Sequence, residues 1–473
     1  MAPSIPNGRV DLLLGQIPES SDVPIPYTST PAKLFWSDIF LIFRYSKDIF
    51  RIVSPLWPFK SGELDELYPL SRANVLDILL HSILVMIQLP YILSLPFWIP
   101  CLVLFPHALW ALIVVTAIIF GITKVFCMIL NGNKIVLQSQ AEIRRSEKHD
   151  SEHWIFINGV SRDLTNTKLA NRKHWLQANI DRLSLTFGRP VTGVHNPTGG
   201  IIFDLVQCII QRDYCYATQD IRDAYAEIKK SLMNPYHTKV VLILHSQGGI
   251  EGGLIIDWLL AEAPQGALRR LEVYTFGNAA NHSNSPSTSV PQPILDQASS
   301  VQTTNGRLVT SLGAPRRHVP RAIRYIEHYG NSHDFVARWG VLNFARMANR
   351  YMGRIFERPG SGHLLNQHYL DYMFPLDPTL RNGYRVALDK NEFMEMDVDI
   401  SARNDANSAT REGPRDAMRS SGGQTTDDVR CQVELDTPIT PGAKPRAPKV
   451  KDFSRLWLYR NGQSPPPEGE GRE

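Results

Sequence analysis

Two long apolar segments, separated by only two residues, constrain this chain more than any other feature. Residues 78–105 carry no charged side chain, and residues 108–130 carry one, Lys124. Crossing a bilayer takes about 20 apolar residues, so either segment is long enough to span one. Because the joint is only Pro106-His107, we expect a helical hairpin whose two ends lie on the same side of a membrane.

The predicted hairpin, residues 78–130, contains three prolines in its first half, Pro90, Pro96 and Pro100. Proline removes a helical hydrogen bond, so this half either spans the bilayer with a bend or dips in and returns. Basic residues flank the hairpin on both sides, which places both flanks in the cytosol. We therefore predict an endomembrane protein, at the endoplasmic reticulum or a lipid droplet, with membrane lipids as partners.

Composition and charge limit the classes of function. Of the 473 residues, 43% are hydrophobic and 20% charged, which is ordinary for a globular chain. The 50 lysines and arginines against 46 acidic residues give a net charge of +4, too weak to indicate a nucleic-acid partner. The five cysteines form no Cys-x-x-Cys pair, so neither a disulfide framework nor a zinc site is predicted. No metal or organic cofactor is implied.

The regions outside the hairpin differ in composition. Residues 1–77 form a mostly polar N-terminal segment, within which residues 33–58 mix aromatic and basic side chains. This mixture predicts either a helix on a membrane surface or a helix packed in a core. Residues 376–473 are polar and rich in Gly, Ser and Pro, so we predict a disordered tail. Residues 450–462 interrupt it with aromatic and leucine side chains, an expected docking motif for a protein partner.

Residues 151–375 alternate strand-like and helix-like patterns. The strand patterns are HWIFING (153–159), RPVTGVHN (189–196), TKVVLIL (238–244), LEVYTFG (271–277), RAIRYIEHYG (321–330) and YMGRIFER (351–358). This alternation predicts an α/β domain with a mostly parallel sheet and helices on both faces, interrupted by an insertion at about 281–318. Active sites of such sheets lie at the carboxyl ends of the strands.

Ser246 follows the most apolar of these strands and begins a helical pattern. Its surroundings match the Gly-x-Ser-x-Gly nucleophile elbow, except that Leu244 replaces the first glycine. The strand–turn–helix context favours a catalytic nucleophile, and the alternative is a serine that caps a helix at a tight turn. The backbone N–H of Gln247 is then the predicted oxyanion donor, with a second donor in the loop that begins at Asn158-Gly159.

An elbow serine needs a base and an acid, which follow it in the order Ser, Asp, His. Asp334 lies in the loop after the fifth strand, and His363 lies in a glycine-rich loop after the sixth. We predict that His363 is the base and that Asp334 fixes its tautomer. His368 is the alternative base, but it falls within a helical pattern. The nearby polar residues expected to have other roles are His245, His328, His333 and Asp257.

Three runs of the sequence resemble the class 3 lipases of the α/β-hydrolase fold: HTKVVLILHSQGG, LEVYTFGNAAN and RYIEHYGNSHDFVARWG. The resemblance covers under half of the chain, within 151–375. It implies that Ser246, Asp334 and His363 form a triad and that Val160 is an oxyanion donor. The whole architecture also resembles a fungal group of uncharacterised membrane-associated hydrolase-like proteins, which implies no particular substrate.

Together these features predict a membrane-anchored serine hydrolase that cleaves an acyl ester through an acyl-enzyme. A site held at a membrane makes a lipid ester the expected substrate. Two alternatives remain open. One is a thioesterase or protein deacylase that uses the same three residues. The other is a hydrolase fold without catalysis that serves as a membrane scaffold and binds its partner through 450–462.

Overall fold

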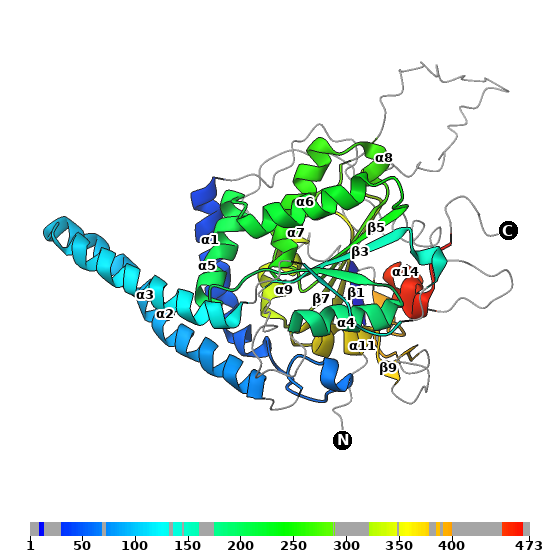
Figure 1. The fold of residues 1–473 in the computed structure, drawn as a ribbon, viewed down its shortest axis with the longest axis horizontal. Helices are drawn as coiled ribbons and strands as arrows, with labels where there is room; N and C mark the ends of the chain where they lie inside the picture. Colours follow the sequence, from blue (N-terminus) through cyan, green and yellow to red (C-terminus); the bar gives the residue numbers. More distant parts are fainter. Residues whose placement is uncertain are drawn as a thin grey trace, which may run out of the picture.

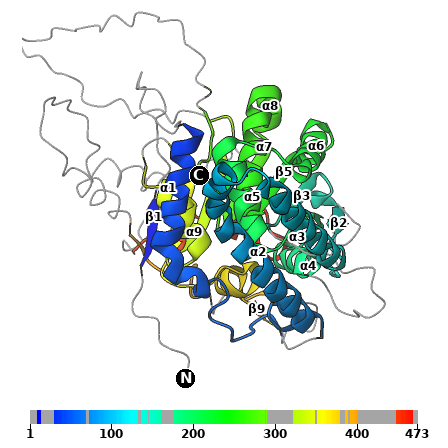
Figure 2. The same cartoon turned by 90° about the vertical axis from the view of Figure 1, so that its left-hand side faces the viewer.

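The computed structural model shows a sheet between two layers of helices, with two long helices that project from one side (Figures 1 and 2). The residues that it describes are 9–13, 30–68, 72–131, 136–143, 146–159, 175–286, 288, 321–347, 350–377, 385–387, 391–399 and 447–466. The statements below concern these residues.

The main sheet has nine strands. They are β1 (Val10–Leu13), β2 (Val136–Gln138), β3 (Glu152–Ile157), β4 (Val191–Val194), β5 (Lys239–His245), β6 (Leu271–Phe276), β7 (Tyr325–Asn331), β8 (Arg354–Arg358) and β11 (Val398–Asp399). Their spatial order is β11-β1-β8-β7-β6-β5-β3-β4-β2. The six strands from β8 to β4 are parallel, whereas β2 and β1 pair antiparallel with β4 and β8. The predicted mostly parallel α/β fold is confirmed. A short separate ribbon pairs β9 (Leu376–Asp377) with β10 (Arg385–Val386).

The central strands are apolar along their whole length because helices cover both faces of the sheet. In β5, Val241 and Ile243 face one layer, and Leu242 and Leu244 face the other. The first layer contains α4 (Trp175–Phe187), the π-helical turn η4 (Leu365–Leu370), α11 (Asp371–Met373), α14 (Val450–Phe453) and η5 (Leu456–Gly462). The second contains α6 (Gln219–Met233), α7 (Gly248–Glu262) and α8 (Gln265–Leu268), beside a cluster built by α1 (Pro31–Tyr45), α5 (Ile201–Tyr214), α9 (Phe335–Trp339) and α10 (Val341–Phe344).

The two projecting helices are α2 (Arg72–Leu104) and α3 (Ala108–Leu130) (Figure 1). The helix α2 continues through its three prolines. Residues 78–104 of α2 and the whole of α3 are long and apolar enough to cross a membrane, and only 17% and 11% of their most apolar windows are buried. The hairpin is attached to the domain near the midpoint of α2 by Gln88, whose Nε2 donates to the Gly199 carbonyl oxygen at 2.8 Å.

The folded domain extends beyond the predicted limits of 151–375. The strand β1 belongs to the main sheet, and Leu64 and Glu66 are buried, so the prediction that residues 1–77 form a separate polar segment is wrong for these residues. A four-residue strand is too short to be recognised by alternation. Its partners β8 and β11 are also far away in the sequence.

The described residues 447–466 also belong to the core. Five apolar side chains of this segment are buried against the first layer: Val450, Phe453, Leu456, Trp457 and Tyr459. Glu272 of β6 accepts hydrogen bonds from Arg455 Nη2 and from the Tyr459 hydroxyl, both at 2.8 Å. The predicted docking motif therefore packs against the sheet of its own chain. Residues 400–446 of the predicted tail and 289–318 of the predicted insertion lie outside the described residues.

Candidate active site

Ser246 lies in the tight turn between β5 and α7. Its φ is +60°, in the left-handed region that L-residues rarely adopt and that an elbow requires. Two backbone hydrogen bonds fix this turn: Ser246 N–H donates to the Phe276 carbonyl oxygen (3.2 Å), and Ala279 N–H donates to the Ser246 carbonyl oxygen (3.1 Å). The serine is only partly buried. The end of β6 therefore holds the serine at the carboxyl edge of the sheet.

Two glycines let the elbow pack against the end of β3. A Cβ at Gly248 would lie 2.4 Å from the Ile157 carbonyl oxygen, and a Cβ at Gly159 would lie 2.9 Å from both Ser246 Cβ and Gln247 N. A side chain at either position would therefore force the elbow away from β3. Gln247, the predicted oxyanion donor, lies immediately before the first turn of α7, where backbone N–H groups lack helical partners. Val160, the other predicted donor, lies outside the described residues.

Leu244 stands where the elbow motif has its first glycine, and the structure shows how it fits. Its side chain is 1% exposed and belongs to the core between β5 and α7. A Cβ at Gly252 would lie 2.3 Å from Leu244 Cδ1. The glycine that makes room for this contact is therefore in the helix rather than in the strand. Leu244 does not obstruct the turn.

Asp334 and His363 come from the loops after β7 and β8 and meet at a hydrogen bond. His363 Nδ1 lies 2.8 Å from Asp334 Oδ2, which also accepts from the Tyr369 hydroxyl at 2.6 Å. The other carboxylate oxygen caps α9 by accepting from Val336 N–H at 2.9 Å. Burial opposes the charge of Asp334, but His363 and these hydrogen bonds hold its pKa below the ordinary value.

The hydrogen bond to Asp334 uses Nδ1 of His363 and leaves Nε2 as the other ring nitrogen of the site. In the neutral imidazole, the proton on Nδ1 faces the carboxylate, so Nε2 carries the lone pair. Nε2 is buried and has no hydrogen-bond partner among the described residues. A Cβ at Gly277 would lie 2.8 Å from both His363 Nδ1 and Asp334 Oδ2, so this glycine, with φ +51°, admits the pair to the end of β6. No hydrogen bond joins the described residues Ser246 and His363.

His245, which precedes Ser246, connects two parts of the site. Its ring stacks on that of His363, with ring centroids 4.6 Å apart. Its Nε2 donates to the His363 carbonyl oxygen (2.7 Å), and its Nδ1 lies 2.8 Å from Asn158 Oδ1 in the loop after β3. Burial, together with the neighbouring His363, lowers the pKa of His245 to about 3. The strand pattern does not predict this contact, because the three residues lie at or after the ends of three different strands.

The alternative base, His368, is occupied elsewhere. Its Nδ1 accepts from Leu364 N–H at 3.0 Å, and its Nε2 donates to the Pro55 carbonyl oxygen at 2.8 Å. With both nitrogens bound to backbone groups, it has none free to act as a base. Asp257 pairs with His282 at 2.9 Å. In the described part of the chain, no group of three or more His, Cys, Asp or Glu side chains is placed to hold a metal ion.

The loop that carries His363 is held by a distant segment, residues 46–66, which we call the strap. His363 N–H donates to the Ile52 carbonyl oxygen at 2.9 Å. Gln367 N–H donates to Glu66 Oε2 at 3.1 Å. These contacts had no signal in the sequence, because the strap has neither a motif nor a periodicity that indicates its partner.

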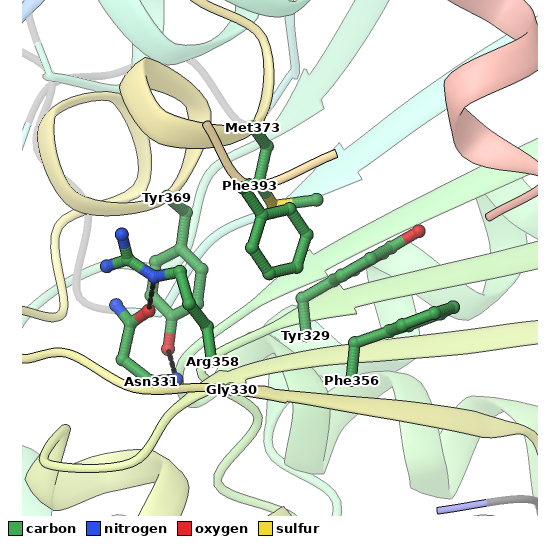
Figure 3. Close-up of a pocket in the computed structure, with 8 residues that line it drawn as sticks. All are labelled: Tyr329, Gly330, Asn331, Phe356, Arg358, Tyr369, Met373 and Phe393. Carbon is green, nitrogen blue, oxygen red and sulfur yellow. Dashed lines mark hydrogen bonds between the residues drawn. The ribbon is translucent and has the colours of Figure 1, made fainter. Parts of the chain in front are cut away.

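A small cavity lies behind Tyr369 (Figure 3). Its lining residues are Tyr329, Gly330, Asn331, Phe356, Arg358, Tyr369, Met373 and Phe393. Arg358 Nε donates to Asn331 Oδ1 at 2.8 Å, and Asn331 N–H donates to the Tyr369 hydroxyl oxygen at 3.2 Å. The cavity has room for about one water molecule. It borders the residues that support Asp334 and is too small for an acyl substrate.

Comparisons with known proteins do not identify a family for this chain. No protein-family model matches the chain, and no curated protein matches it. A solved structure of a candidate hydrolase from Agrobacterium vitis S4 aligns at 15% identity over 50% of this chain and 90% of that one, with a TM-score of 0.25. A structural similarity with so low a TM-score supports no conclusion about function. The comparisons also give no support for the predicted similarity to a fungal group of proteins. The parallel sheet with helices on both faces defines an α/β-hydrolase-like fold.

Proposed function

We propose that this chain is a membrane-anchored serine hydrolase that cleaves an acyl ester. The observation that carries the proposal is the position of three groups at one edge of the sheet. Ser246 lies in a left-handed turn after β5, and the hydrogen-bonded pair Asp334–His363 follows β7 and β8. The end of β6 contacts both through Phe276 and Gly277.

The geometry supports the following chemistry. The Ser246 hydroxyl turns toward His363 Nε2, transfers its proton there and attacks the ester carbonyl carbon. Asp334 stabilises the imidazolium that forms. The Gln247 N–H donates to the carbonyl oxygen as it becomes negative. The carbonyl–alkoxy bond then breaks, the alcohol leaves with the proton from His363, and water releases the acyl group as a carboxylic acid by the same steps.

A membrane location supports a lipid ester as the substrate. The two apolar helices are mostly exposed, whereas a core helix of this length would be mostly buried. Their exposed side chains need an apolar environment, which a bilayer supplies. We further propose that the domain faces the cytosol, because basic residues flank both ends of the hairpin. The endoplasmic reticulum or a lipid droplet fits this arrangement.

The experiment is labelling and turnover by the full chain, purified in detergent and reconstituted in vesicles. A fluorophosphonate probe should label the wild type, and Ser246→Ala should abolish both labelling and ester hydrolysis. His363→Ala should match that loss. The control is His333→Ala, an exposed histidine next to Asp334, which should behave as wild type.

Matched oxyesters and thioesters of several chain lengths would distinguish a lipase-like enzyme from a thioesterase or deacylase. Folded wild-type protein that takes up no probe and hydrolyses none of these substrates would establish the non-catalytic scaffold instead.

A further inference from the structure

The segment from α1 through residue 57 separates its side chains by charge. Within the described stretch 30–57 there are two acidic residues, Asp38 and Asp48, and both are buried. Asp38 forms an ion pair with Arg212 of α5, and Asp48 forms one with Arg338 of α9. The acidic groups are therefore neutralised on the inner side of the segment.

The outer side of the same segment is aromatic and basic. Five aromatic side chains are 64% to 83% exposed: Trp36, Phe40, Phe43, Phe50 and Trp57. The lysines and arginines Lys33, Arg44, Lys47 and Arg51 are exposed among them. We call this surface the aromatic face. Exposed aromatic rings mixed with cations and without exposed carboxylates are typical of a helix that lies in a membrane interface.

The aromatic face is continuous with the hairpin. Figure 2 shows α1, α5 and the hairpin helices α2 and α3 on the same side of the molecule, and in Figure 1 α1 runs across the direction in which the hairpin projects. The helix α5 links them: its Arg212 binds Asp38 of α1, and its Phe203 stacks on Phe120 of α3 with ring centroids 5.2 Å apart. A bilayer that surrounds the hairpin would therefore meet α1 along its length.

We propose that the aromatic face docks on an anionic lipid bilayer and that this docking holds the catalytic histidine in place. The second part rests on the proposed function. The cations select anionic lipids, because each Lys or Arg near such a surface is attracted to it. The aromatic rings occupy the boundary between headgroups and acyl chains.

The strap transmits docking to the site, because its exposed side chains alternate with the carbonyl groups that hold the histidine loop. Phe50 is 83% exposed, and His363 N–H binds the carbonyl oxygen of Ile52, two residues further on. Trp57 is 68% exposed, and the carbonyl of its neighbour Leu56 accepts from Gln367 Nε2 at 2.7 Å. A displaced strap would break these bonds, so a seated strap favours the productive position of His363.

The test uses the full chain in vesicles of phosphatidylcholine alone or mixed with phosphatidylserine, with the water-soluble ester p-nitrophenyl butyrate. Wild-type turnover should rise in the mixed vesicles. Lys33→Gln/Lys47→Gln should lose this rise, because two cations contribute roughly a 30-fold preference for an anionic surface. The matched control, Lys230→Gln/Arg269→Gln, removes two exposed cations from α6 and the end of α8 and should keep the wild-type ratio.

Two further variants separate docking from coupling. Brominated lipids should quench more tryptophan fluorescence in the wild type than in Trp36→Phe/Trp57→Phe. Gln367→Ala should leave that quenching unchanged while lowering kcat, but not thermal stability, in the mixed vesicles.

Equal quenching in wild type and the double tryptophan variant would overturn the docking, and an unchanged anionic-lipid ratio in the double lysine variant would do the same. Wild-type kcat in Gln367→Ala would overturn the coupling. The wild type could show lipid quenching while neither it nor any variant hydrolyses the ester. That result would defeat the proposed function and the coupling but would support the docking surface.

Discussion

The nucleophile elbow and the histidine loop lie at the same edge of the sheet but are built in different ways. The elbow is local, because β5, Ser246 and α7 are consecutive and their glycines pack against neighbouring strand ends. The histidine loop depends on the strap, and the hydrogen bond between Gln367 and Leu56 joins residues 311 positions apart. The difference teaches that the position of His363 depends on residues far outside its own part of the chain, whereas Ser246 is held by its neighbours in the sequence and by the adjacent strand ends.

The largest effect is expected at the acid of the histidine loop. Asp334→Asn keeps the shape of the side chain but lets its amide donate toward His363, which favours the wrong tautomer. Such a change lowers kcat by about 10⁴-fold in a serine hydrolase. Steady-state kinetics with a soluble ester measures it, and fluorophosphonate labelling should slow in parallel. Wild-type kcat would show that Asp334 is only the cap of α9.

The next effect concerns the C-terminal segment 447–466, which is part of the core on the first layer of the sheet. Trp457 is 6% exposed and stacks on Phe374, with ring centroids 5.8 Å apart. Trp457→Ala should lower the free energy of unfolding by about 3–5 kcal/mol, measured by thermal unfolding of the full chain. Tyr236→Ala, at an 83% exposed aromatic residue, is the control. Equal melting temperatures would mean that residues 447–466 are not part of the core.

A double-mutant cycle would test the local construction of the elbow. Gly252→Ala places a methyl group 2.3 Å from Leu244 Cδ1 and should cost about 1–3 kcal/mol of stability. Leu244→Ala alone should also destabilise, but the double variant should lose less than the sum, because the new methyl group enters the vacated space. Gly266→Ala, with nothing within 4 Å of its Cβ, is the control. Strict additivity would contradict the direct contact.

The strap should make stability depend on pH through Glu66. Burial raises its pKa from 4.5 to about 7, aided by Asp371, although N–H groups of Asn366 and Gln367 act against it. Since the folded state binds this proton more tightly, its contribution to stability is full below 4.5 and is lost as pH rises through about 7. Glu66→Gln removes this titration, so the melting temperature of wild type should fall relative to the variant over that interval. Parallel melting curves would contradict the raised pKa.

The smallest effect is expected behind the acid. Tyr369→Phe removes the hydroxyl that donates to Asp334 at 2.6 Å while the ring keeps its place in the core. A hydrogen bond to a charged group stabilises by about 1.5–3 kcal/mol, part of which is shared with other donors, so kcat should fall by about tenfold. Tyr372→Phe, on the next helix, should leave kcat unchanged. A fall equal to that of Asp334→Asn would make Tyr369 as important as the acid.

Much of the site could be predicted because it follows strand ends. Parallel strands bring their carboxyl ends to one edge, so Ser246, Asp334 and His363 could each be located from the strand that precedes it. The support around them could not. Tyr369 and His245 form hydrogen bonds to residues of other segments, and nothing in the strand pattern indicates which segments touch.

By itself, the sequence determined the apolar hairpin, the parallel sheet and the elbow, because apolar length, alternation and glycine spacing act on neighbouring residues. Only the tertiary structure decided that the strap and residues 447–466 belong to the domain. Their contacts join the ends of the chain to its middle, and a segment of mixed composition can pack against many surfaces. Which surface it covers depends on the shape that the rest of the fold leaves exposed. Here residues 447–466 pack on the face of the sheet that α4 and η4 also cover.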